Sequence, residues 1–278
     1  TLGNLDEAAR VLCHSLGSPV RISASGRQPP RMKTLLPKDP IRFAWSGHLG
    51  LTMLEPVLHQ LEKAASSLLF TNTRSQAELW YQAILQARPD WAGQMALHHG
   101  SLDSDTRAWV EKATAAGELR VVVATSSLDL GVDFTPVEQV FQVGSPKGVA
   151  RLLQRAGRSG HQPKGVSSLY MVPTHGFEIL ESLAAQQAID EGFIEPRRPL
   201  RLPLDVLAQH LVTRILGDPM TEQALFAEVR ESHAFKDLSL KDFHWTLEFL
   251  SQGGASLGAY PDFHRIQCNA QGQWQMQD

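Results

Sequence analysis

Three polar segments of the sequence carry residue types that bind phosphate groups, and each follows a short apolar run. They span residues 71–74, 98–103 and 124–133. Small hydroxyl and amide side chains, together with backbone N–H groups at the start of a helix, suit phosphate oxygens. Taken singly, Ser, Thr and Asn at such positions more often cap helices and form turns than bind a ligand. A phosphate-binding surface is therefore predicted only if the three segments lie together in the fold.

A fourth segment, residues 154–161, is cationic. It carries Arg155 and Arg158, and the surrounding residues 139–177 contain no Asp or Glu. The whole chain has a formal net charge of −3, which argues against a protein whose entire surface coats nucleic acid. A local cationic stretch in an acidic chain indicates a specific anion site, and the alternative is a solvent-exposed basic face.

The apolar pattern of the chain predicts the strands and helices that would position these segments. Short runs rich in β-branched or apolar residues predict strands, and runs with apolar residues at 3/4 spacing predict helices. The strands are expected at residues 67–71, 119–125, 139–143 and 167–172, and the helices at 75–87 and 103–116. Strands that alternate with helices predict βαβ units and a parallel sheet. Ligands of such sheets bind at the carboxyl ends of the strands, which is where the three polar segments fall.

The residues before this sheet have a different pattern. We expect an amphipathic helix at 5–16 and a short strand at 20–23. Residues 24–39 are dense in Pro, Arg and Lys and predict a linker. Residues 51–65 predict a helix that leads into the first strand of the sheet.

After about Phe193 the pattern changes again. Several prolines separate the sheet from three helical stretches at residues 205–216, 221–232 and 239–252. Thr221 and Ser239 are expected to cap the second and third of these helices, and Gly253 to end the third. The tail at 256–276 alternates weakly around glycines. Three helices followed by a β-hairpin predict a winged-helix domain.

Composition limits the class of protein. With 278 residues, 42% hydrophobic and 20% charged, the chain is long enough for two globular domains. No apolar run approaches the ~18 residues of a membrane-spanning helix, and the first residues lack the pattern of a signal peptide. Cys13 and Cys268 lie far apart without metal-ligand spacing, so neither a disulfide nor a metal site is expected. The sequence predicts a cytoplasmic protein.

The four segments together resemble motifs IV, IVa, V and VI of superfamily 2 helicases. They read FTNTRSQAE, HHGSLD, ATSSLDLGVDF and QRAGRSGH, in that order. The resemblance is closest to the Lhr (large helicase-related) type, particularly the ligase-associated DEXH-box branch, and PLDVLAQHLV and AYPDFHR extend it over nearly the whole chain. It implies an α/β fold: a RecA-like parallel-sheet lobe followed by a mostly helical winged-helix domain. The implied boundaries are 1–39 for the end of a first lobe and a linker, 40–192 for the second lobe and 193–278 for the winged helix.

The resemblance implies an ATP site on the second lobe. Arg158 matches the arginine finger, which stabilises charge on the transferring γ-phosphoryl group. Gln154 would hydrogen-bond the γ-phosphate or the attacking water, and both residues are the expected catalytic groups. Gly131, Asp133 and His161 complete the implied site, although His161 stands where many superfamily 2 proteins have a second arginine. Arg155 is ~300° from Arg158 around a helix, so it is expected to pack between lobes or to pair with an acidic residue.

The resemblance also implies a single-strand track that contacts phosphates and not base edges. The matching residues are Asn72, Thr73, Arg74, His99, Gly100, Thr125 and Ser126. Tryptophans could stack on bases, and the chain has six: Trp45, Trp80, Trp91, Trp109, Trp245 and Trp274. Of these, Trp80 and Trp109 are expected in the core. The third helix of the winged helix carries Asp242 and Glu248 against Lys241, which favours a wall along the strand, or a purely structural domain, over a sequence reader.

The implied whole protein is an ATP-dependent 3′-to-5′ DNA translocase and helicase in DNA repair. The chain lacks a G-x-x-x-x-G-K-[ST] loop and an Asp-Glu-x-His motif, so ATP and Mg²⁺ are expected to bind mainly to the first RecA-like lobe, and this chain alone to bind neither. Implied partners are single-stranded DNA or a 3′-tailed duplex, that first lobe, and a repair ligase or nuclease, in the nucleoid of a bacterial cytoplasm. The alternatives are a helicase of RNA or of RNA–DNA hybrids, and a non-catalytic nucleic-acid-binding scaffold.

Overall fold

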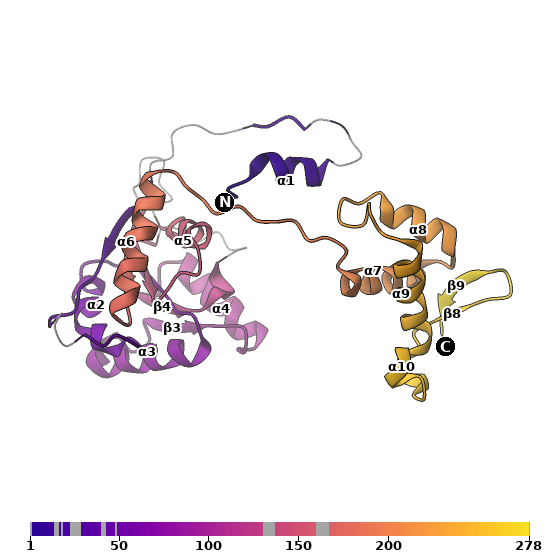
Figure 1. Cartoon of the computed structure of the whole chain (residues 1–278). Coiled ribbons are helices and arrows are strands. Elements are labelled where there is room, and N and C mark those ends of the chain that lie inside the picture. Colours follow the sequence, from indigo (N-terminus) through magenta and orange to yellow (C-terminus); the bar gives the residue numbers. More distant parts are fainter. Residues whose placement is uncertain are drawn as a thin grey trace. The chain divides into compact units, whose positions relative to one another are not determined.

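The computed structural model describes residues 2–13, 17, 19–22, 29–39, 43–47, 49–129, 137–159 and 167–277. The chain divides into two compact units (Figure 1). The first unit consists of Thr1–Gly3 and Ala24–Pro196, and the second of Asn4–Ser23 and Arg197–Asp278. Each unit has its own hydrophobic core and is described separately.

The first unit is built on a six-stranded sheet with the order β1-β6-β5-β2-β4-β3, in which every neighbouring pair is parallel. The strands are β1 (Arg31–Thr34), β2 (Ser67–Phe70), β3 (Met95–His98), β4 (Val121–Ala124), β5 (Gln139–Val143) and β6 (Ser168–Val172). The predicted parallel sheet is confirmed, and the strand expected at 139–143 has those bounds.

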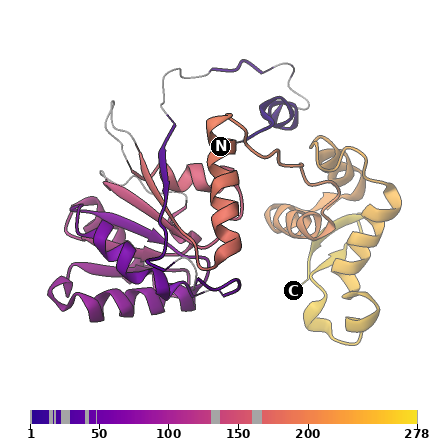
Figure 2. The ribbon, with the colours of Figure 1, turned by 60° about the vertical axis from the view of Figure 1, so that its left-hand side comes forward.

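Helices cover both faces of this sheet (Figure 2). Because both faces are covered, every residue of β2, β4 and β5 is buried, and β4 is a continuous apolar run. One face of the sheet packs against α4 (Ser104–Ala115), α5 (Val149–Ala156) and α6 (Gly176–Asp190), and Phe70 and Val122 lie in that core. The other face packs against α2 (Leu54–Leu61), preceded by a 3₁₀ turn at Leu51–Met53, and α3 (Arg74–Ala87), with Leu69 and Phe141 in its core.

The predicted linker at 24–39 is wrong in its second half. Arg31–Thr34 form the edge strand β1, and Arg31 pairs with Ser168 of β6. Exposed and half-buried side chains alternate along β1, because an edge strand has one neighbour and is only partly covered. Its polar residues therefore give it the composition of a loop. At the N-terminus, helix α1 spans Leu5–Leu12, and residues 20–22 do not form the expected strand.

The second unit has the predicted winged-helix elements. Its three main helices are α7 (Leu204–Gly217), α8 (Glu222–Arg230) and α9 (Leu240–Gln252), followed by the short α10 (Gly254–Leu257). An antiparallel sheet has the order β7-β9-β8, formed by Met220–Thr221, Gln273–Met276 and Ile266–Cys268. Residues of the three helices and of β8 form one core, which includes Leu207, Leu211, Leu225, Phe243, Leu247 and Ile266.

The expected helix caps of the second unit are confirmed. The Thr221 hydroxyl accepts a hydrogen bond from the Ala224 N–H at 3.3 Å, and the Ser239 hydroxyl accepts one from the Asp242 N–H at 3.0 Å. Gly253 ends α9 in the left-handed region, with φ +72°, and its N–H donates to the Phe249 carbonyl. These contacts satisfy backbone groups that the helix ends would leave unpaired.

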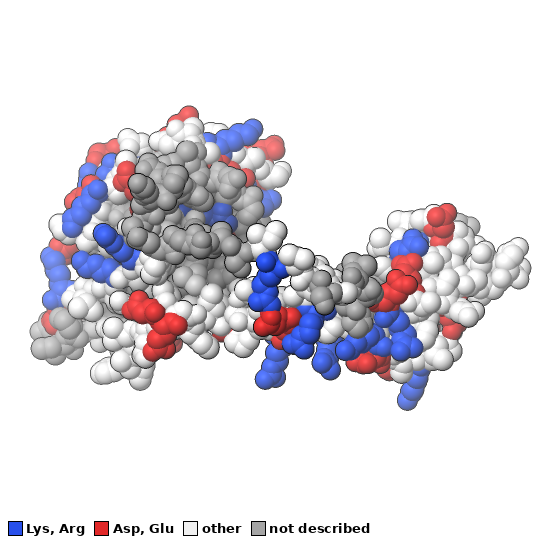
Figure 3. Space-filling model, turned by 90° about the horizontal axis from the view of Figure 1, so that it is seen from above, with Lys and Arg blue, Asp and Glu red and all other residues white. Residues whose placement is uncertain are grey.

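Acidic and basic side chains are both present on the visible surface (Figure 3). No helix among the described residues is long and apolar enough to cross a membrane. Within the same residues there is no group of three His, Cys, Asp or Glu side chains that could hold a metal ion. Cys13 and Cys268 are not disulfide-bonded.

Candidate functional site

The three polar segments lie side by side at the carboxyl edge of the sheet. Phe70 pairs with Ala124, and Ala124 pairs with His98, so β2, β4 and β3 end at the same level. The Thr71 N–H donates to the Ala124 carbonyl at 2.8 Å, and the Thr125 N–H donates to the His98 carbonyl at 3.1 Å. The condition for a shared phosphate-binding surface is therefore met: the segments belong to one edge.

The segment after β2 both caps a helix and presents exposed polar groups. The Thr73 hydroxyl accepts a hydrogen bond from the Gln76 N–H at 3.2 Å, which makes Thr73 the N-cap of α3. Asn72 and Arg74 are exposed on either side of it. The Asn72 amide donates to the Ser145 carbonyl at 2.9 Å, and the Arg74 guanidinium donates to the Ser101 hydroxyl at 3.2 Å. These bonds join the loops after β5, β2 and β3.

The other expected track residues differ in accessibility. Gly100 and Ser126 are exposed, and Thr125 is half-buried. His99 is only 5% exposed, and its Nε2 lies 3.6 Å from a carboxylate oxygen of Glu78. Its Nδ1 has no hydrogen-bond partner in the described part of the chain. His99 thus lies beneath the exposed surface that its neighbours form.

The tryptophans divide into buried and exposed sets. Trp80 is fully buried, as expected, and its indole N–H donates to the Leu49 carbonyl at 2.8 Å. Trp109 was expected in the core but is 55% exposed, because the buried face of α4 is formed by Val110 and Ala113 and not by Trp109. The Trp91 ring is buried, and the guanidinium groups of Arg88 and Arg120 lie 4.4 Å and 4.7 Å from its centre. Side chains with an exposed ring are those of Trp45, Trp109 and Trp245.

The cationic segment is joined to the segment after β4 by a buried ion pair. Arg155 on α5 is 1% exposed, and its Nε donates to Oδ1 of Asp129 at 2.7 Å while Nη2 donates to Oδ2 at 3.3 Å. Its Nη1 donates to the Gln142 amide oxygen, and the guanidinium lies 4.6 Å from the centre of the Phe70 ring. Burial lowers the pKa of Arg155, and the Asp129 carboxylate opposes that shift. Arg155 therefore has the acidic partner that was expected for it.

Asp129 also contacts Arg158, the second arginine of the cationic segment. The Arg158 Nη2 donates to the backbone carbonyl of Asp129 at 2.8 Å. Arg158 and Gln154 are both half-buried, so each keeps part of its side chain accessible. One residue of the β4 loop thus contacts Arg155 through its carboxylate and Arg158 through its backbone. The expected site residues Gly131, Asp133 and His161 lie outside the described residues.

A buried histidine beside the same loop was not anticipated. His98 Nδ1 lies 2.7 Å from the Ser127 hydroxyl, and its Nε2 lies 3.2 Å from Oε1 of Glu111 on α4. The Ser127 hydroxyl in turn donates to the His98 carbonyl at 2.9 Å. His98 is the last residue of β3, so the three side chains connect β3 and α4 to the loop after β4. No spacing in the sequence brings these three residues together, since Ser127 and Glu111 belong to different elements.

His98 predicts a pH dependence of stability. Burial lowers the pKa of His98 below its ordinary value of 6.5, although Glu111 opposes the shift. The unfolded chain therefore binds a proton more readily than the folded chain, and the stabilisation is lost as pH falls below about 6.5. We expect the thermal midpoint to fall between pH 7.5 and 5.5, and to fall less in a His98→Gln variant. Equal pH slopes for both proteins in calorimetry would contradict the assignment.

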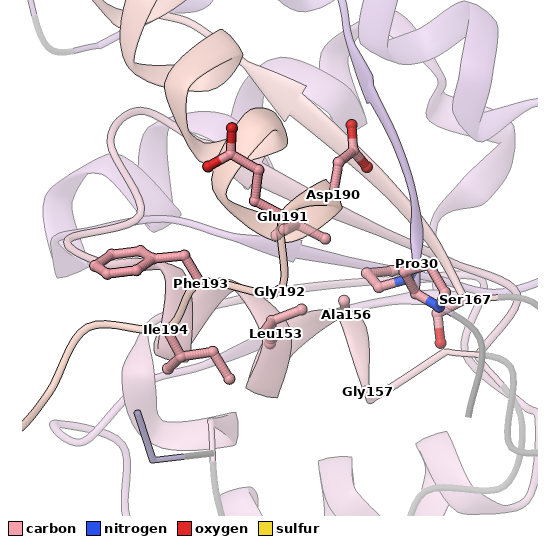
Figure 4. Close-up of a pocket in the computed structure, with 12 residues that line it drawn as sticks. Pro30, Leu153, Ala156, Gly157, Ser167, Asp190, Glu191, Gly192, Phe193 and Ile194 are labelled. Atoms are coloured by element: carbon pink, nitrogen blue, oxygen red, sulfur yellow. The ribbon is translucent and has the colours of Figure 1, made fainter. Parts of the chain in front are cut away.

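A cavity of about 550 Å³ lies away from the carboxyl edge (Figure 4). It is lined by residues of α5, by the end of α6 and by the segment after it, and includes Leu153, Ala156, Ile189 and Phe193. None of the polar segments that follow β2, β3 and β4 contributes to its lining.

Comparison with known proteins identifies both units. Residues 51–162 match the helicase conserved C-terminal domain, and residues 187–278 match the winged helix domain of large helicase-related protein. The solved structure of the Mycobacterium smegmatis helicase Lhr bound to ssDNA and AMP-PNP is 31% identical, with a TM-score of 0.86 over 100% of this chain and 36% of that one. The chain belongs to the Lhr family. All four polar and cationic segments of this Lhr chain lie within the residues that match the helicase domain.

Curated Lhr proteins agree with this assignment. The Escherichia coli Lhr helicase/uracil glycosylase is 35% identical over 74% of this chain and 15% of its own length. The ATP-dependent helicase Lhr-Core of Sulfolobus acidocaldarius is 31% identical over 90% of this chain and 29% of its own length. This Lhr chain therefore spans less than a third of the length of either relative.

Proposed function

We propose that the whole protein is an ATP-dependent 3′-to-5′ single-stranded DNA translocase and helicase. Residues 31–192, which include the edge strand β1, would be its second RecA-like lobe, residues 193–278 its winged helix, and the residues before β1 the end of the first lobe with a linker. The observation that carries the proposal is the link through Asp129. The loop after β4 contributes to the exposed carboxyl edge, and the same loop holds Arg158 by a 2.8 Å hydrogen bond. A strand on that edge and a nucleotide at Arg158 would therefore act on one loop.

In this proposal ATP is the substrate, bound between this lobe and the first lobe. Arg158 would reach the γ-phosphoryl group as the arginine finger, and Gln154 would hydrogen-bond the γ-phosphate or the attacking water. Both side chains are half-buried on or just after α5, so each keeps part of its surface accessible to a ligand. Gly131, Asp133 and His161 would complete the site. Mg²⁺ would be held by the first lobe and would neutralise charge on the phosphates.

The strand would bind along the carboxyl edge through its phosphates. Asn72, Arg74, Gly100 and Ser126 are exposed there and offer amide, guanidinium, backbone and hydroxyl donors. Thr73 and Thr125 would contribute from the same loops, and His99 would support them from below. Contacts of this kind do not read bases, so binding should tolerate any sequence and weaken with salt. The solved M. smegmatis relative bound to ssDNA and AMP-PNP supports both ligands.

The winged helix would form a wall beside the strand. The exposed side of α9 presents Trp245 stacked on Phe249, with 5.6 Å between ring centroids, and the helix carries one lysine and two acidic residues. A helix that reads the major groove of DNA is normally more basic than this. A flat aromatic surface with little positive charge suits apolar contact with a displaced strand better than phosphate binding.

Unwinding assays test the substrate and the direction together. We expect the whole protein to separate a duplex with a 3′ single-stranded DNA tail in the presence of ATP and Mg²⁺, and to leave the matched 5′-tailed duplex intact. A matched set of DNA, RNA and hybrid duplexes with the same sequence would be measured in parallel. Preference for an RNA tail would replace the DNA assignment, and loss of all unwinding with retained binding would favour a non-catalytic scaffold.

We further propose that the protein acts in DNA repair in the bacterial nucleoid, within the ligase-associated branch of the family. A ligase or nuclease of the same repair process would then be its partner. Co-purification of the whole protein with such an enzyme from its native cells, lost on high-salt washing but insensitive to nuclease, would support a direct contact.

A further inference from the structure

The loop between β5 and α5 contains an unusual backbone conformation. Lys147 has φ +61°, in the left-handed region that non-glycine residues rarely adopt. A glycine would take this conformation without steric cost, whereas the Cβ of lysine meets the neighbouring carbonyl oxygen. Backbone strain of this kind persists where the surroundings impose it, and it concentrates at functional sites.

The surroundings do impose it, because contacts on both sides hold the loop. The Ser145 carbonyl accepts from the Asn72 amide at 2.9 Å, and the Ser145 N–H donates to the Glu178 carboxylate at 3.0 Å. On the other side, the Glu195 carboxylate accepts from the N–H groups of Val149 and Ala150 at 3.1 Å. The loop therefore has little freedom to relax around Lys147.

The Lys147 side chain is the part of this loop that is available to bind a ligand. It is exposed, and within the described residues it has no hydrogen bond or ion pair. The two nearby carboxylates are occupied, because Glu178 accepts from Thr174 and Ser145, and Glu195 from the first N–H groups of α5. Since Glu195 already fills the N-terminus of α5, an anion at this loop would have to meet the lysine ammonium.

The loop also adjoins the strand-binding edge. Asn72, an exposed residue of that edge, donates to the carbonyl of Ser145, two residues before Lys147. In addition, β5 is the direct neighbour of β2 in the sheet. The carboxyl edge that begins with the loop after β3 therefore continues past the loop after β2 to Lys147.

We propose that Lys147 binds a backbone phosphate of the nucleic-acid strand and extends the track from the β2 loop to the β5 loop. This inference rests on the proposed function of the carboxyl edge. It explains why a lysine occupies a position at which glycine would be less strained: the charge is needed there, in a fixed place.

The substitution Lys147→Gly tests the proposal, because the relief of backbone strain should raise stability whereas the loss of charge should weaken DNA binding. Lys147→Gly relieves the backbone strain, so we expect a higher thermal midpoint of unfolding. The same change removes one phosphate contact, so we expect single-stranded DNA to bind roughly fivefold more weakly at 0.1 M salt. The slope of log K against log salt should become about 0.7 less steep. The affinity for single-stranded DNA of mixed sequence would be measured with the whole protein. Thermal unfolding would be measured with the same preparation.

Two further variants serve as controls. Lys147→Arg keeps the charge and should bind single-stranded DNA within about twofold of the wild type. Lys112→Ala removes an exposed lysine from the last turn of α4, at the opposite edge of the sheet, and should leave the salt slope unchanged. The KM for ATP at saturating DNA should be unchanged in all three variants, and a raised KM in Lys147→Gly alone would assign Lys147 to the nucleotide and overturn the proposal.

The outcomes separate this inference from the function on which it rests. If the wild-type protein binds no single-stranded nucleic acid, the proposed function itself fails. If the wild type binds and Lys147→Gly binds equally well with an unchanged salt slope, only the role of Lys147 is overturned. A lower thermal midpoint together with weaker binding would show a structural role and would also overturn it.

Discussion

Replacing Arg158 by alanine in the whole protein is expected to lower kcat for ATP hydrolysis by about 10³–10⁵-fold, as for arginine fingers of related NTPases. Arg158 would supply positive charge that stabilises the transferring phosphoryl group more than the ground state. The effect should therefore appear in kcat and leave the affinity for single-stranded DNA within about threefold. Steady-state hydrolysis at saturating DNA, combined with a DNA-binding titration, measures both quantities.

Two controls make the Arg158 result specific. Arg158→Lys keeps the charge but not the planar, forked guanidinium, so we expect it to restore only a small part of the rate. Arg31→Ala removes an exposed arginine from the edge strand β1 and should hydrolyse ATP as the wild type does. A rate within about threefold of the wild type for Arg158→Ala would remove Arg158 from the catalytic site and favour the scaffold interpretation.

Replacing Asp129 by alanine should cause the largest loss of stability among the site residues. The change leaves the Arg155 guanidinium buried, at 1% exposure, without its carboxylate partner. Breaking a buried ion pair from one side typically costs about 3–5 kcal/mol, because the remaining charge stays desolvated. We expect the free energy of unfolding of the first unit to fall by about that amount in urea denaturation.

The double variant Asp129→Ala, Arg155→Met tests the cause of this loss. Because it removes both charges, it should be more stable than Asp129→Ala alone. Asp90→Ala provides a surface comparison, since Asp90 pairs with Arg88 at an exposed site and its loss should change stability little. A double variant less stable than Asp129→Ala would show that something other than the unpaired guanidinium causes the loss.

The sequence predicted the frame of the first unit because its central strands are buried on both faces. A run such as 121–124 is therefore continuous and apolar. The edge strand β1 escaped prediction because an edge strand is half-exposed, and Arg31 and Lys33 give it the composition of a linker. Trp109 was misplaced for a related reason: helical spacing identifies an apolar stripe, but not whether a bulky residue at its border is covered.

In the candidate site, features that depend on neighbouring residues or on strand ends were predictable, and contacts between distant side chains were not. The strand-end segments were predictable, because parallel strands place their carboxyl ends at one edge. The caps at Thr221 and Ser239 were predictable for a similar reason, since a cap depends on residues three positions apart. The partners of Arg155 were not, because Asp129 and Gln142 come from the loop after β4 and from β5. The strained backbone of Lys147 has no signature in the sequence, since it depends on distant contacts from Asn72, Glu178 and Glu195.

The central claim is that this chain is one half of an ATP-driven motor on nucleic acid. It is tested most directly by ATP hydrolysis measured for the whole protein and for the isolated 278 residues, each with and without single-stranded DNA. We expect hydrolysis by the whole protein to be strongly stimulated by the DNA, and none above background by the isolated chain in either condition. Hydrolysis by the isolated chain, or a whole protein indifferent to single-stranded DNA and RNA alike, would contradict the account.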